Sequence, residues 1–172
     1  YPIKVGVNEK FVMALATSPE KKARWSVQQT ERRLVEAEKL AVSGWLSGKT
    51  TAQLVSAVSL HAQQAGFAAQ NIEAMGDISG AVAIHSALEA SLSAHNRILT
   101  AVDDAQSMQS PYVQQLIQQV VEAEHEASYA RAKGETELIA ATPSREAALP
   151  AIVHERTGAI EAMVAEMRAQ EQ

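Results

Sequence analysis

The sequence contains no cysteine, so neither a disulfide framework nor a thiolate metal site is possible. Aromatic residues make up only 4% of the 172 residues, whereas 47% are hydrophobic. A core built from this composition must consist mainly of Ala, Leu, Ile, Val and Met. Because small side chains let helix backbones approach closely, the composition favours helix-on-helix packing over a β-sandwich. The length fits a single domain spanning residues 1–172.

Positive charge is outnumbered by negative charge. The formal net charge is −5, which argues against nucleic-acid binding because a basic surface is needed to neutralise phosphates. No run of 18 apolar residues is present, so no segment of this sequence is expected to span a membrane. The chain starts at Tyr1 without an initiator methionine or a leader sequence. We therefore expect a protein that is processed or shortened ahead of Tyr1.

Motifs for covalent catalysis and nucleotide binding are also missing. Gly-x-Ser-x-Gly, the strained turn that exposes a nucleophilic serine, does not occur, and neither does Gly-x-Gly-x-x-Gly. The segment SGKTT, residues 47–51, resembles the end of a phosphate-binding loop, but it lacks the earlier glycine and a preceding strand. We interpret it as a turn with a threonine cap. We expect no enzymatic activity and no cofactor.

Helical periodicity is present throughout the chain. Apolar residues recur at steps of 3 and 4 between Leu54 and Met75, which is the spacing of one helix face. Serine precedes proline at residues 18–19 and again at 110–111. Both pairs are typical of a helix start, because serine is a good N-cap and proline suits the first helical position. We find no alternating strand pattern and no hairpin turn.

These signals predict one short helix followed by long ones. The short helix is expected at residues 3–16. The long helices are expected at about 19–43 ending at Gly44, 51–75 ending at Gly76, 80–103 capped by Ser79, and 111–141, with a last helix after Ser144. The predicted fold class is therefore all-α: an elongated antiparallel bundle of four to five long helices preceded by one short helix.

The opening of the chain carries a distinctive pattern. Tyr-Pro-x-Lys opens it at residues 1–4, Ser-Pro-Glu-Lys follows at 18–21, and Glu-Arg-Arg-Leu-x-Glu-Ala-Glu occupies 31–38. Over residues 1–44, and more loosely beyond, the chain resembles a bacterial family of helical domains of unknown function. Members of that family often follow a signal sequence or a single membrane-spanning helix, and some belong to anti-sigma-factor-like chains. The resemblance implies an extracytoplasmic domain, periplasmic or at the cell surface, anchored by a segment that precedes Tyr1. It implies no catalytic residues.

Histidine and glutamate offer the alternative of a metal or small-ligand site. Glu122 and His125 have the Glu-x-x-His spacing with which di-iron bundles aim two ligands inward, and His61 and His95 lie on the apolar faces of two other helices. A di-iron bundle needs two such motifs and two further glutamates, but only one motif is present. We therefore expect no metal and interpret His61 and His95 as partly buried residues, hydrogen-bonded to neighbours, that fix the register of the helices. The alternative is a site formed by His61, His95, Glu122 and His125.

The function expected from these observations is a non-enzymatic, extracytoplasmic helical-bundle module for protein interaction or sensing. Its partner is expected to be a protein rather than nucleic acid, and a membrane is involved only through a segment outside this sequence. The glutamine-rich pieces VQQT, AQQAGFAAQN and VQQLIQQV are uncharged polar helix surface, either an interaction face or simply exposed bundle. The sequence leaves the oligomeric state open. The alternative function is binding of a metal ion or small ligand through core His and Glu residues.

Overall fold

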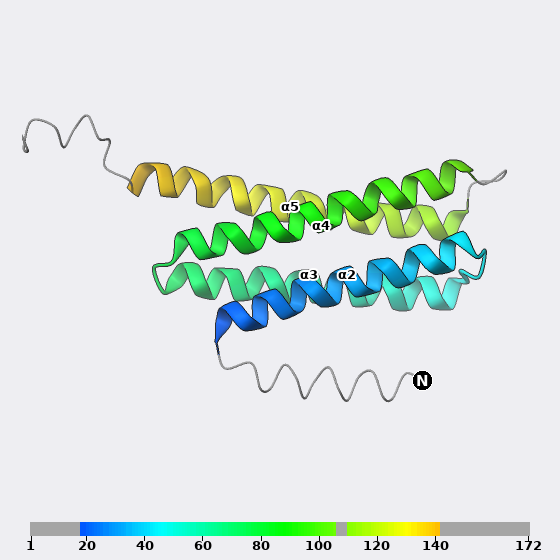
Figure 1. The fold of residues 1–172 in the computed structure, drawn as a ribbon, viewed down its shortest axis with the longest axis horizontal. Coiled ribbons are helices and arrows are strands. Elements are labelled where there is room, and N and C mark those ends of the chain that lie inside the picture. The colour runs from blue at the N-terminus through cyan, green and yellow to red at the C-terminus, as the bar shows by residue number, and fades with distance from the viewer. Residues whose placement is uncertain (1–17, 106–109, 142–172) are drawn as a thin grey trace, which may run out of the picture. The chain divides into compact units, whose positions relative to one another are not determined.

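The computed structural model describes residues 18–105 and 110–141. These residues contain no strand and form four helices, α2 (Pro19–Val42), α3 (Gly48–Ala74), α4 (Ile78–Ala105) and α5 (Pro111–Ala141) (Figure 1). The all-α prediction is confirmed. The short helix expected at residues 3–16 and the helix expected after Ser144 lie outside the described residues. Contacts divide the chain into one unit up to Glu137 and another from Leu138 onward.

The helix starts predicted from the two Ser-Pro pairs are found. Ser18 is extended, and its side-chain oxygen accepts a hydrogen bond from the backbone N–H of Lys21 at 3.3 Å, which satisfies one of the unpaired donors at the helix start. The second pair starts α5 at Pro111. The predicted stop of α2 is found as well: Gly44 takes a positive φ of 69°, a conformation open to glycine without strain.

α3 starts at Gly48 rather than near Thr51, so the interpretation of SGKTT as a turn with a threonine cap is wrong. Ser47 caps the helix instead. Its side chain accepts from the Thr50 N–H at 3.3 Å, and the Thr50 hydroxyl oxygen accepts from the Ser47 N–H at 2.8 Å. Because this capping box satisfies two backbone donors at once, the helix begins at Gly48, inside the SGKTT segment.

α4 also starts earlier than the sequence predicts, at Ile78 rather than Gly80. The predicted cap, Ser79, lies inside the helix. Asp77 takes its place, because its carboxylate Oδ1 accepts a hydrogen bond from the Gly80 N–H at 2.7 Å. A carboxylate at this position is also favoured by the positive end of the helix dipole.

All four helices contribute side chains to the core. The apolar line predicted from Leu54 to Met75 is buried except for Met75 itself, which caps α3 and is exposed. The largest fully buried apolar side chains are leucines of α2, α4 and α5, Ile72 of α3, and valines of α3 and α5. The main cluster contains Leu34, Ala37 and Ala41 of α2, Leu54, Val58, Ala62 and Ala65 of α3, Leu88, Leu92 and Leu99 of α4, and Val113, Leu116, Val120, Ala123 and Ala127 of α5.

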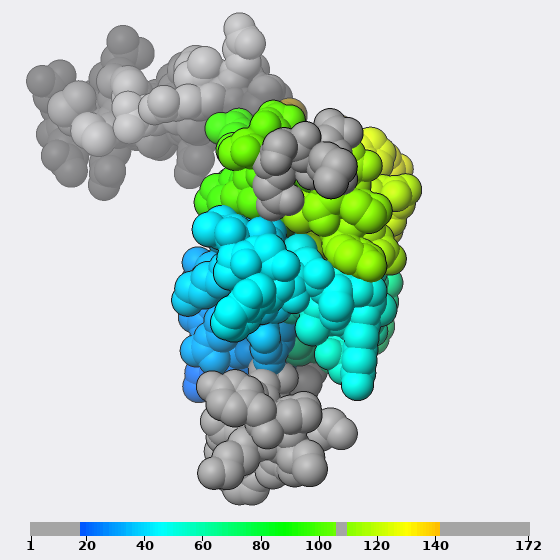
Figure 2. Space-filling model, turned by 90° about the vertical axis from the view of Figure 1, so that its right-hand side faces the viewer, coloured from blue at the N-terminus to red at the C-terminus, as the bar shows by residue number. Residues whose placement is uncertain are grey.

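The helices lie side by side in two pairs. In the end-on view of Figure 2, α2 and α3 (blue to cyan) form one layer and α4 and α5 (green to yellow) form the next. α2 packs on both α3 and α4, and α3 packs on α4. α5 reaches the same core through its valines, leucine and alanines. This packing buries one face of α3 and leaves its opposite face on the surface.

Candidate functional site

The outer face of α3 is notable for its lack of charge. Between Lys49 and Glu73 the helix contains no Asp, Glu, Lys or Arg. Exposed side chains recur along it at alternating steps of 3 and 4 residues, so they form a single line on the face opposite the core. We call this line the outer stripe of α3. It consists of Gln53, Ser56, Leu60, Gln63, Phe67, Gln70 and Ala74.

Large apolar and uncharged polar side chains alternate along the outer stripe. Leu60 is 52% exposed and Phe67 is 66% exposed. Ser56, Gln63 and Gln70 separate them at steps of 3 and 4. Amides and hydroxyls form hydrogen bonds without the large desolvation cost of a charged group. A stripe with this spacing fits contact with another helix, whose side chains interlock at the same period.

Two hollows lie along the outer stripe. The larger has a volume of about 780 Å³ and is lined by Leu60, Gln63 and Phe67 of α3, with further walls from α4 and α5. The surface at Gly66 is open, since a Cβ added there would meet no atom within 4 Å. The smaller hollow has a volume of about 520 Å³ and lies nearer the start of α3. It is lined by Lys49, Ala52, Gln53, Ser56, Ala57 and Leu60.

His85 of α4 lines the larger hollow but is only 6% exposed. Within the described part of the chain its Nδ1 has no hydrogen-bond partner. Burial lowers the pKa of His85 because the imidazolium is poorly solvated there, and the nearby charge of Glu73 on α3 acts in the opposite direction. The imidazole is therefore neutral at pH 7. It adds no charge to a hollow whose α3 wall is itself uncharged.

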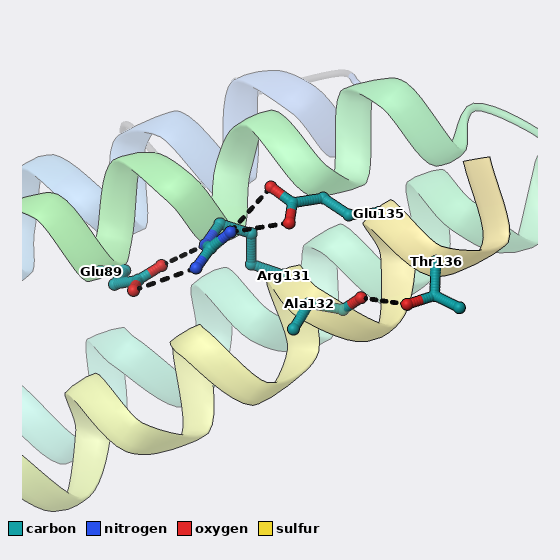
Figure 3. Close-up of polar contacts among 5 residues, drawn as sticks. All are labelled: Glu89, Arg131, Ala132, Glu135 and Thr136. Carbon is teal, nitrogen blue, oxygen red and sulfur yellow. Dashed lines mark hydrogen bonds and ion pairs between the residues drawn. The ribbon is translucent and has the colours of Figure 1, made fainter. Parts of the chain in front are cut away.

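Ion pairs hold the α5 wall of the larger hollow against α4. The guanidinium Nε of Arg131 lies 2.5 Å from Glu89 Oε2, and its Nη1 lies 2.7 Å from Glu135 Oε1 (Figure 3). Glu89 and Glu135 both raise the pKa of Arg131, and the hydrogen bond from Arg131 lowers the pKa of Glu89. About two helical turns away, the side chain of Asn96 on α4 donates a hydrogen bond to Glu124 on α5 at 3.3 Å.

Two further contacts place α5. Lys133 Nζ lies 3.4 Å from Glu73 Oε1 and links α5 to α3. Gly134 is buried where α5 approaches α4, and a Cβ added there would lie 2.6 Å from Cγ2 of Val82. The approach at this point therefore depends on glycine. Together with the Arg131 ion pairs, these contacts fix the position of the α5 residues that line the larger hollow.

The residues of the alternative metal site are not brought together. His61 is buried in α3, where its Nδ1 lies 3.2 Å from Oε1 of Gln64 and its ring meets Trp25 of α2 edge-on, with 5.7 Å between centroids. Glu122 and His125 are exposed on α5. Within residues 18–105 and 110–141, no three His, Asp or Glu side chains are placed to share a metal ion.

His95 is buried in α4, and its Nδ1 lies 2.5 Å from Oε1 of Glu38 in α2. This is the cross-helix contact that the sequence interpretation assigned to a buried histidine. Neither the Glu38 partner nor the burial of His85 was predicted. The outer stripe was recognised only as uncharged helix surface. Its signal in the sequence is the absence of charge from residue 50 to residue 72, combined with a second line of 3–4 spacing beside the core line.

No protein-family model, curated protein or solved structure matches this chain. None of the described helices combines the length and the apolar character needed to cross a membrane.

Proposed function

We propose that this chain is a non-enzymatic helical-bundle module that binds a protein partner through the outer stripe of α3. The observation that carries the proposal is the exposure of Leu60 and Phe67 on a helix face without charge. Single exposed apolar residues are ordinary, but apolar residues aligned with hollows and separated only by uncharged groups are typical of interaction surfaces.

The lining of the larger hollow supports binding rather than covalent chemistry. Its described residues are mainly alanine, leucine, glutamine and asparagine, with Lys22, His85 and Glu126, and they include no serine, threonine or cysteine. The amide groups of Gln63, Gln70 and Asn71 provide both donors and acceptors. Such amides, together with the apolar side chains beside them, suit contact with the side chains and apolar face of a helix.

We further infer that the helices form an antiparallel, up-and-down bundle. The cross-helix contacts support this order. Along α5, the step from Glu124 to Arg131 moves the contact on α4 back from Asn96 to Glu89, by equal numbers of residues in opposite directions. The short connections 43–47 and 75–77 also favour antiparallel neighbours. The proposal includes the short helix that the sequence predicts at residues 3–16 and the fifth long helix that it predicts after Ser144.

We propose an extracytoplasmic location, periplasmic or at the cell surface, with an anchoring segment ahead of Tyr1. The support is the resemblance of residues 1–44 to a bacterial family whose members often follow a signal sequence or a membrane-spanning helix. External protease applied to intact cells that express the full gene tests it. We expect digestion while a cytoplasmic marker stays intact. Protection until the cells are lysed would contradict the location.

A photo-crosslinking amino acid at position 67 tests the proposed interaction surface in the same cells. The matched control carries the crosslinker at position 32, where Arg32 is exposed on α2. We expect a discrete adduct from position 67 and a weaker or different pattern from position 32. Adducts of equal yield from both positions, or none from position 67, would show that the outer stripe is not the binding surface.

A further inference from the structure

We propose that the partner of the outer stripe is the outer stripe of a second copy of this chain, packed antiparallel about a two-fold axis. This inference rests on the proposed function and names its partner. A two-fold contact is isologous, so the same surface must be complementary to itself. The sequence along α3 has a register that meets this requirement.

The register follows from the spacing of the outer stripe. In an antiparallel pair of helices with 3–4 spacing, a residue that follows a step of 4 faces a residue of the other helix that follows a step of 3. With the axis between residues 60 and 63, Leu60 faces Gln63 of the second copy, and Gln53 faces Gln70 of the second copy. The first pair sets an apolar side chain against the stem of a glutamine. The second pair joins two amides that can hydrogen-bond to each other.

The same register places Phe67 opposite Ser56 of the second copy. Phe67 is the most exposed large residue of the stripe, at 66%. Ser56 is small, and it lies on the wall of the smaller hollow between Ala52 and Ala57. The large side chain of one copy therefore faces a shallow, open part of the surface of the other, which the described residues of α3 alone line. Because of the two-fold axis this contact of Phe67 with small side chains occurs twice.

Charge favours self-association on this face. Each copy has a net charge of −5, so two copies repel each other wherever acidic groups meet. The outer face of α5 exposes Glu122 and Glu126, so two such faces repel each other, whereas α2 exposes more basic than acidic residues. The outer stripe carries no charge between residues 50 and 72. At its end the register sets Lys49 beside Ala74 of the second copy, where a cation suits the negative end of the helix dipole.

The extent of the contact indicates a reversible dimer. From Gln53 to Ala74 the stripe is about 32 Å long, and one helix from each copy falls at the lower end of the interface sizes found in stable complexes. Small interfaces of this kind are typical of transient complexes. The dimer should dissociate on dilution while the bundle stays folded.

Sedimentation equilibrium of the whole chain over a concentration series tests the dimer. We expect Phe67→Glu to raise the dissociation constant at least tenfold and Phe67→Leu to raise it less. The matched control is Tyr129→Glu, which places the same charge at an exposed aromatic residue of α5 and should leave association unchanged. Circular dichroism shows that each variant is folded. A monomer at every concentration, or a Phe67→Glu dimer as tight as the original, would overturn the proposal.

Disulfide trapping tests the register, since the natural sequence has no cysteine. A mixture of Phe67→Cys and Ser56→Cys chains should form a heterodisulfide. Either chain alone should not, because its two cysteines are offset by 11 residues, or about 16 Å along the helix, beyond the reach of a disulfide. Faster trapping of Phe67→Cys alone would show a parallel or shifted contact and refute the register.

The photo-crosslinking experiment separates this inference from the proposed function. An adduct from position 67 with the mass of two copies supports both. An adduct with a different protein, from a chain that remains monomeric, upholds the proposed function and refutes the second copy as partner. The absence of any adduct refutes both.

Discussion

The Nδ1 of His95 in α4 lies 2.5 Å from Oε1 of Glu38 in α2, and their side chains are only 10% and 14% exposed. A polar contact of this kind ties two helices at one level, because sliding either helix by a turn would leave both groups buried without a partner. The contact therefore fixes the register between α2 and α4 more strictly than the surrounding leucines and alanines do.

Replacing one partner of this contact should destabilise the bundle. Glu38→Leu leaves the His95 imidazole buried without its acceptor, and we expect a loss of about 1–3 kcal/mol in the free energy of unfolding. Adding His95→Leu should restore part of that loss, which a double-mutant cycle by urea denaturation measures. Glu36→Leu, at an exposed position two residues earlier, is the control. A cycle with no coupling between positions 38 and 95 would contradict the proposed role.

The sequence was sufficient to predict the four described helices and the buried face of α3, apart from the exact starts of α3 and α4. Serine before proline marked two starts, glycine marked a stop, and the 3–4 spacing from Leu54 to Ile72 marked the core side of α3. Each of these signals is local, since a cap or a periodic face depends on residues within one or two turns. Local competition also explains the two wrong starts, where Ser47 and Asp77 capped the helices ahead of Thr51 and Ser79.

The contacts between helices could not be predicted in the same way. Glu38 and His95 are 57 residues apart, and Arg131 meets Glu89 across 42 residues. Many carboxylates share a helix with Glu38 or Glu89, and only the packing of the helices selects the one that pairs. Gly134 illustrates the same limit: glycine is a poor helix former, and only the packing of α5 on α4 shows that its missing Cβ allows the close approach to Val82.

Truncation of the buried face of α3 should be costly. Leu54 is 5% exposed and Ile72 is 0% exposed, so Leu54→Ala and Ile72→Ala should each reduce the free energy of unfolding by about 2–5 kcal/mol. Val121→Ala, at a residue of α5 that is 45% exposed, should have little effect. Urea denaturation provides the measurement. Losses below about 0.5 kcal/mol at both core positions would show that the opposite face of α3 is buried.

The two helical glycines should respond in opposite directions to alanine. Gly66→Ala places a Cβ in open space and should stabilise the chain by about 0.5–1 kcal/mol, because alanine is the better helix former. Gly134→Ala places a Cβ 2.6 Å from Val82 Cγ2. Since valine is stiff, this should cost about 1–3 kcal/mol.

Val82→Ala combined with Gly134→Ala removes the clash and should recover most of that loss. Thermal unfolding of the four proteins distinguishes the cases. If Gly134→Ala proved as favourable as Gly66→Ala, α5 would not approach α4 as closely at Val82 as described.

Metal removal should leave the protein unchanged. Among the described residues, no three His, Asp or Glu side chains are placed to share a metal ion. Glu122 and His125 are exposed on α5, whereas His61 and His95 are buried. Protein purified without added metal should contain substoichiometric zinc and iron by elemental analysis, and a chelator should not shift its melting temperature. Stoichiometric metal that is lost with His95→Ala or His125→Ala would revive the alternative site.

Acid should weaken the bundle through His85. Burial lowers the pKa of His85 in the folded chain, with Glu73 opposing the shift, whereas an unfolded histidine titrates near 6.5. Above about pH 6.5 the residue is neutral in both states and contributes no pH dependence. As the pH falls below this value the unfolded chain binds the proton first, so the free energy of unfolding decreases until the folded-state pKa is passed.

His85→Gln should therefore flatten the stability profile between about pH 7 and pH 5, measured as urea midpoints at fixed ionic strength. This window lies above the titration of the carboxylates, whose contributions appear at lower pH. His125→Gln is the matched control, because it removes a histidine that is exposed on α5, and it should retain the acid sensitivity of the original chain. A His85→Gln protein that loses stability as steeply as the original would assign the effect to another group.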